Sequence, residues 1–114
     1  MGALNNIITM IRGDSLTLEI ALNDGKTAYE LADSDIVYFG LMDPGQLFED
    51  ALVKKKGYLT DINDNGKLVF ELSPDDTLDL LPGKYYYSIK LHINHGNEDK
   101  VITLVNKTKF IICD

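Results

Sequence analysis

The segment from Asp61 to Gly66 carries oxygen atoms that could bind a calcium ion. Asp61, Asn63 and Asn65 stand at alternate positions before Gly66, as in the first half of a calcium-binding loop. The acid that should bind the ion with both oxygens would then fall at position 72, which is Leu72. The flanking sequence also resembles strands and not helices. We therefore interpret the segment as a hairpin turn and predict no metal.

A cluster of three carboxylates, Asp75, Asp76 and Asp79, could in principle do acid–base work. The cluster directly follows Ser73-Pro74, and a serine cap, a proline at the first position and acids in the first turn are typical of a helix start. We interpret these acids as helix-capping residues. Only one or two helical turns fit before Pro82-Gly83, so we expect a short helical turn near 73–80.

The remaining reactive side chains form no arrangement that catalysis requires. His92 and His95 have no serine, cysteine or glutamate at the spacing of a triad or a zinc site. Cys113 is the only cysteine, so a disulfide within the chain is impossible. We predict no catalytic residue, no cofactor and no enzymatic activity.

Arg12-Gly13-Asp14-Ser15 spells the tetrapeptide that integrins bind. Integrin binding requires an extracellular loop, whereas this tetrapeptide joins two expected strands, and Gly-Asp is common in turns. We interpret it as a turn.

Alternation of apolar and polar residues with a period of two dominates the chain and predicts strands. Turn residues interrupt the alternation, including Asn23-Asp24-Gly25, Asn63 to Gly66 and His95-Gly96-Asn97. Residues 46–52 remain open between helix, loop and strand, and we favour a loop with a strand from about Ala51. The other expected strands cover residues 15–22, 28–31, 36–42, 58–62, 68–72, 84–93 and 101–112, the last broken near Asn106.

These short, evenly spaced strands predict an all-β fold. We expect an immunoglobulin-like antiparallel β-sandwich of about seven to nine strands, forming a single domain over residues 1–114. Tyr85 opens the longest strand after Pro82-Gly83, where its hydroxyl could bond to the preceding backbone as in a tyrosine corner.

The formal net charge of −7 argues against partners that are themselves anionic. A chain with 11 basic residues among 114 is a poor candidate for binding nucleic acid or an anionic membrane surface. The sequence contains neither a membrane-spanning apolar run nor the pattern of a signal peptide. We expect a protein made in a cytoplasm.

Aromatic, apolar and lysine side chains offer a candidate interaction surface. We expect the tyrosines to point outward from a sheet, where they could anchor a protein or stack on a sugar, and the lysines to lie along a strand edge. The candidate residues are Tyr38, Leu47, Phe48, Lys54, Lys55, Lys56, Tyr58 and Tyr86.

Four stretches of the sequence together resemble a known family. An Ile-rich first strand runs into Arg12-Gly13-Asp14-Ser15, and the later stretches are Leu72 to Thr77, Leu81 to Ile89 and Thr103 to Ile112. The pattern resembles the small immunoglobulin-like domains of tail and baseplate proteins from bacteriophages and prophages of Gram-positive bacteria. It is similar to the N-terminal domain of upper baseplate proteins.

The resemblance implies a structural role in a virion, without catalytic residues. It implies that the partners are other phage structural proteins or copies of the same chain. In the second case the chain would form a homo-oligomer. The rival hypothesis is a module that binds a carbohydrate or another ligand through exposed tyrosines. That hypothesis expects several exposed aromatic rings in one concavity, whereas the structural role expects an exposed apolar strip or edge.

Overall fold

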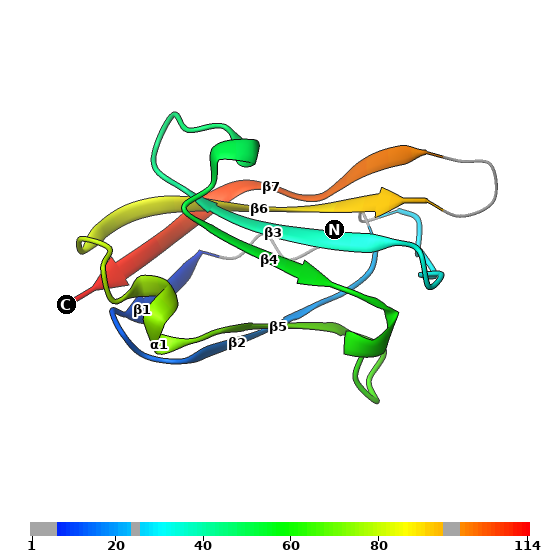
Figure 1. The fold of residues 1–114 in the computed structure, drawn as a ribbon, viewed down its shortest axis with the longest axis horizontal. Helices are drawn as coiled ribbons and strands as arrows, with labels where there is room; N and C mark the ends of the chain where they lie inside the picture. The colour runs from blue at the N-terminus through cyan, green and yellow to red at the C-terminus, as the bar shows by residue number, and fades with distance from the viewer. Residues whose placement is uncertain (1–6, 24–25, 95–98) are drawn as a thin grey trace.

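Two β-sheets pack face to face in the computed structural model, which describes residues 7–23, 26–94 and 99–114 (Figure 1). The larger sheet has five strands in the order β1-β7-β6-β3-β4, and the smaller sheet pairs β2 with β5. The predicted all-β, sandwich-like fold is confirmed. The strands are β1 (Ile8–Ile11), β2 (Leu16–Ile20), β3 (Ile36–Met42), β4 (Val53–Gly57), β5 (Leu68–Leu72), β6 (Gly83–Ile93) and β7 (Lys100–Cys113).

The core fills the space between the two sheets and follows the alternation in the sequence. Tyr85, Tyr87, Ile89, Leu91 and Ile93 of β6 are all buried, as the period of two predicts. They pack with the apolar residues of β2 and β5 in one cluster. Burial raises the pKa of the Tyr87 hydroxyl to about 12. A single core therefore joins both sheets.

The connection from β5 to β6 crosses from one sheet to the other and contains the only α-helical turn in the described residues, α1 (Pro74–Thr77). The Asp76 carboxylate accepts a hydrogen bond of 2.7 Å from the Ser73 N–H, which caps the helix start that the sequence predicts at Ser73-Pro74. The crossing ends where the hydroxyl of Tyr85 donates to the carbonyl of Leu81. The hydrogen bond expected of a tyrosine corner is therefore present.

Asp76 also ties α1 to the larger sheet. Its carboxylate lies 2.8 Å from the Lys55 ammonium of β4. Burial alone would raise the pKa of Asp76, but hydrogen bonds from Lys55 and Ser73 and the Lys55 charge outweigh it and hold the pKa below 3.8.

The segment Arg12-Gly13-Asp14 forms a turn between β1 and β2, as expected. Gly13 has a φ of 83°, which favours glycine. Its N–H donates to the hydroxyl of Thr77 over 2.9 Å, so the turn packs against α1.

Three strand predictions were wrong or incomplete. Residues 58–62 contain a 3₁₀ turn, η2 (Leu59–Asp61), because the Asp61 carboxylate accepts the Tyr58 N–H and closes a local turn. Residues 28–31 form no strand: Ala28 makes an isolated bridge with Asn23, and the Tyr29 N–H donates to the Leu22 carbonyl over 2.8 Å. The sheet order is also not wholly antiparallel, since β1 runs parallel to β7.

The last strand is continuous, contrary to the predicted break near Asn106. Two register shifts between Tyr87 and Lys90 of β6 absorb the irregularity as bulges in the ladder with β7. The Ser88 hydroxyl donates to the Val105 carbonyl over 2.7 Å at this point. The strand therefore bends without ending.

Two predicted turns, at Asp24-Gly25 and at 95–97, lie outside the described residues. The third is present, since the Gly66 N–H donates to the Asn63 carbonyl over 3.0 Å and Gly66 has a φ of 75°. No helix within the described ranges is long and apolar enough to cross a membrane.

Candidate functional site

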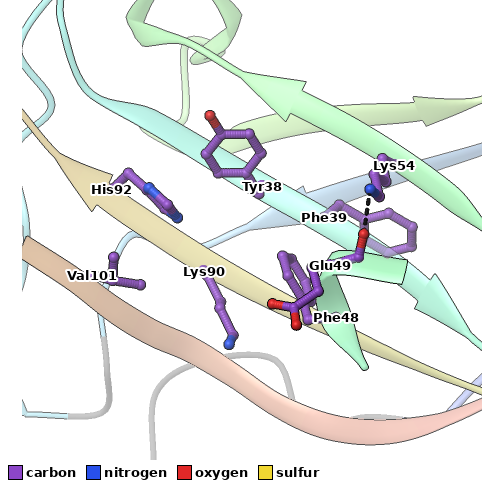
Figure 2. A pocket seen from close by; sticks show the side chains of 8 residues that line it. All are labelled: Tyr38, Phe39, Phe48, Glu49, Lys54, Lys90, His92 and Val101. Carbon is purple, nitrogen blue, oxygen red and sulfur yellow. Dashed lines mark hydrogen bonds between the residues drawn. The ribbon is translucent and has the colours of Figure 1, made fainter. Parts of the chain in front are cut away.

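A groove of about 390 Å³ lies on the outer face of the five-stranded sheet, away from β2 and β5. Strands β3, β4, β6 and β7 and the 3₁₀ turn η1 (Phe48–Asp50) form it. Figure 2 shows the lining side chains, which are Tyr38, Phe39, Phe48, Glu49, Lys54, Lys90, His92 and Val101.

The loop between β3 and β4 folds back onto the sheet and forms one wall of the groove. Gln46 fastens this loop at two points. Its side-chain oxygen accepts the Asp43 N–H over 3.0 Å, and its main-chain carbonyl accepts the Lys107 ammonium of β7 over 2.8 Å. Residues 46–52 are thus a loop with a single 3₁₀ turn, and β4 follows from Val53. This is close to the loop and strand that we favoured from the sequence.

Gly40 of β3 allows Phe48 to lie directly on the sheet. A Cβ atom at Gly40 would stand 2.8 Å from Cε1 of Phe48 and 3.2 Å from the Cβ of Ala51. No side chain larger than hydrogen fits there unless η1 moves. The glycine therefore fixes where the aromatic wall of the groove stands.

Amino groups lie over two aromatic rings of the groove, those of Phe48 and Tyr38. The Lys90 ammonium stands 4.9 Å from the centroid of the Phe48 ring, and the Lys56 ammonium stands 5.9 Å from the centroid of the Tyr38 ring. The His92 ring meets the Tyr38 ring edge to face at 4.6 Å. The groove thus combines an apolar floor with cationic groups above it.

The charge of the groove is opposite to the charge of the whole chain. Lys54 and Lys90 line it and Lys56 lies beside it, whereas Glu49 is the only acid in the lining. The Lys54 ammonium donates to the main-chain carbonyl of Glu49, so that both side chains border the same opening (Figure 2). Such a surface suits a partner that brings apolar groups together with carboxylates.

The structure brings together four of the eight residues that the sequence singled out as an interaction surface. Tyr38, Phe48 and Lys54 line the groove, and Lys56 covers the Tyr38 ring. Each comes from β3, β4 or the loop between them, where the antiparallel pairing places Tyr38 opposite Lys56.

The other four candidate residues lie elsewhere. Lys55 makes the ion pair with Asp76 and so contributes to the link between β4 and α1. Tyr58 is exposed beyond the end of β4, and Leu47 is exposed next to η1. Tyr86 is half-buried on β6, opposite Met42, outside the groove lining.

Sequence reasoning missed Lys90, His92 and Val101 as members of this surface. The alternation in β6 did place Lys90 and His92 on the face away from the core. Their proximity to Tyr38 depends on the pairing of β3 with β6, which sets Tyr38 opposite Lys90. No signal within a single strand specifies that register.

Asp61, Asn63 and Asn65, which match the first half of a calcium-binding loop, lie at the end of η2 and in the turn before β5. The side-chain oxygen of Asn63 accepts the N–H groups of Asn65 and Lys67, each over 3.0 Å, and its amide donates to Glu19. Asp61 accepts the Tyr58 N–H. Across the described part of the chain, no group of three or more His, Cys, Asp or Glu residues could hold a metal ion.

Comparison with known proteins adds no relationship: no protein-family model matches the chain, and no curated protein matches its sequence.

Proposed function

We propose that this chain is a non-enzymatic structural module of a phage or prophage tail or baseplate that acts through protein–protein contacts. The single observation that carries the protein-contact part is the basic, aromatic-walled groove on the outer face of the larger sheet. An exposed apolar patch bordered by charged groups is typical of a surface that binds another protein.

The strand arrangement supports the comparison with immunoglobulin-like phage domains. In such a sandwich two sheets share Greek-key connections, and a tyrosine at the crossing bonds back to the chain. Here β7, β6 and β3 are neighbours in one sheet, β2 and β5 pair in the other, and Tyr85 bonds to Leu81. The resemblance of residues 72–77 and 81–89 to phage domains covers this same crossing.

The second candidate function is carbohydrate binding, which the concavity with Tyr38 and Phe48 favours. Sugars bind by stacking on open aromatic faces, however, and the Lys56 and Lys90 ammonium groups stand over these rings. The two lysines would have to leave before a sugar could stack. A protein contact keeps them in place, and we therefore prefer it.

Purified virions test the proposed function directly. Particles are isolated from an induced culture of the strain that encodes the chain, and an antibody raised against it is applied with gold labelling in the electron microscope. We expect label on the tail or baseplate and the chain among the virion proteins in mass spectrometry. An abundant cytoplasmic protein measured in the same particles controls for contamination.

Absence of the chain from virions that contain their other tail proteins would overturn the proposal. A glycan array then tests the second candidate function, carbohydrate binding. Saturable binding to one sugar, abolished by Tyr38→Ala, would favour the ligand-binding module.

A further inference from the structure

A second exposed surface, which we call the acidic end, lies at the α1 end of the sandwich (Figure 1). Its apolar side chains are unusually open to solvent, with Ile11 and Leu78 each 54% exposed and Leu81 76% exposed. Exposed acidic residues lie close to these apolar residues in the sequence. The acidic end consists of Ile11, Asp14, Asp75, Leu78, Asp79 and Leu81.

Contacts between two segments hold the acidic end together. The Gly13 N–H bonds to the hydroxyl of the buried Thr77 over 2.9 Å, and a Cβ at Gly13 would meet Cδ1 of Leu78 at 3.4 Å. The turn after β1 therefore packs against α1. The carbonyl of Leu81 is fixed by Tyr85. The acidic end is thus a shaped surface on ordered elements.

The acidic end and the groove complement each other in charge and in polarity. The groove has lysines around an apolar floor, and one of its walls includes Val101, which is 54% exposed. The acidic end has apolar side chains, Leu78 and Leu81, next in the chain to the exposed residues Asp75 and Asp79. Opposite charges that flank matched apolar groups favour association and fix its orientation.

We propose that the groove binds the acidic end of a second copy of this chain. This inference rests on the proposed function, because it names the partner of the same groove. In the contact, Leu78 and Leu81 of one copy enter the groove of the next, and Asp75 and Asp79 face Lys54 and Lys90.

The contact is head-to-tail, because the two surfaces occupy different parts of the molecule. The acidic end lies where β6 begins, and His92 and Val101 of the groove lie where β6 ends and β7 begins (Figure 1). A contact between two different surfaces leaves one of each free on every dimer, so that copies continue to add until a ring closes or a filament grows.

Both surfaces are small, so a single contact is weak and depends on salt. Specific stable interfaces bury about 1,200–2,000 Å² in total, and contacts below that range are transient. The lysine–carboxylate part also weakens as the Debye length falls from about 30 Å at 0.01 M salt to about 8 Å at 0.15 M.

Sedimentation velocity across a wide range of concentration, at low salt and with a reductant because Cys113 is exposed, tests the inference. We expect the average mass of the wild type to rise with concentration and to fall again when salt is added. The groove variant Lys54→Glu/Lys90→Glu and the acidic-end variant Asp75→Lys/Asp79→Lys should each weaken self-association by about tenfold or more, because like charges then face each other.

Mixing the two variants is the decisive measurement. Each variant associates only weakly with itself, but the unchanged acidic end of the groove variant fits the unchanged groove of the acidic-end variant. The two reversed surfaces are complementary as well. We expect the mixture to regain the association of the wild type.

The control variant Lys26→Glu/Lys67→Glu makes the same change of net charge as the groove variant, at residues that belong to neither surface, and should associate like the wild type. Circular dichroism establishes that each variant is folded. A wild type that stays monomeric at every concentration, or variants whose mixture does not associate, would overturn the inference. Detection of the chain in virions is independent of this result, so the proposed function could still hold with a different partner.

Discussion

At the scale of the residue, the hydroxyl of Tyr85 holds the crossing between the two sheets through its bond to the Leu81 carbonyl. Burial is the main reason that the pKa of this hydroxyl is raised, which favours the protonated form that donates the bond. We predict that Tyr85→Phe lowers the free energy of unfolding by about 1 kcal/mol, the usual net value of one hydrogen bond. Urea denaturation followed by circular dichroism measures it.

The neighbouring variant Tyr86→Phe is the matched control, because Tyr86 is half-buried on the opposite side of the same strand. It should change stability by less than about 0.5 kcal/mol, as surface substitutions do. Equal losses in the two variants would show that the Tyr85 hydroxyl has no special role.

At the scale of the element, α1 is a single turn that relies on Asp76 for its cap and for its link to Lys55 of β4. The pKa of Asp76 lies below 3.8 in the folded chain, so the unfolded state binds a proton first as pH falls. The stabilisation that Asp76 provides is therefore complete above the pKa that Asp76 has in the unfolded chain. It is lost as the pH falls through the lower pKa that Asp76 has in the folded chain. We predict that Asp76→Asn costs about 1 kcal/mol at neutral pH, as the loss of a helix cap does, and removes this part of the acid dependence.

Urea denaturation at neutral pH and at an acid pH below 3.8 tests this prediction, because the pKa of Asp76 in the folded chain lies below 3.8. Asp75→Asn serves as the control, since Asp75 is exposed in the same turn. The prediction fails if wild type and Asp76→Asn lose the same stability on acidification.

At the scale of the whole molecule, the two sheets share one core and should unfold together. Leu68 of β5 and Ile89 of β6 are both fully buried, and they belong to different sheets and the same cluster. A Cβ at Gly57 of β4 would stand 2.7 Å from Cδ2 of Leu68, so the sheets approach closely. We predict that Leu68→Ala and Ile89→Ala each cost about 2–5 kcal/mol and leave a single transition.

Far-ultraviolet circular dichroism and tyrosine fluorescence should report the same midpoint for both variants. If the smaller sheet melted first, Leu68→Ala would separate the two signals while Ile89→Ala would not. That result would contradict a shared core.

The sequence by itself determined the local features of this protein, because each of them depends on neighbours in the chain. Alternation on β6 identified the buried face correctly, the Ser73-Pro74 pattern located α1, and Pro82-Gly83 before Tyr85 indicated the hydrogen bond at the crossing. The same local reasoning failed at 58–62, where one Asp61 side chain bonded to the backbone outweighs strand propensity.

Only the tertiary structure decided which strands are neighbours, and hence where the groove lies. Tyr38 and Lys90 are 52 positions apart in the chain and opposite each other in the ladder. Alternation tells which face a residue occupies, but strand order and register depend on packing across the whole sandwich. The parallel pairing of β1 with β7 and the position of the β3–β4 loop over Gly40 follow from that packing.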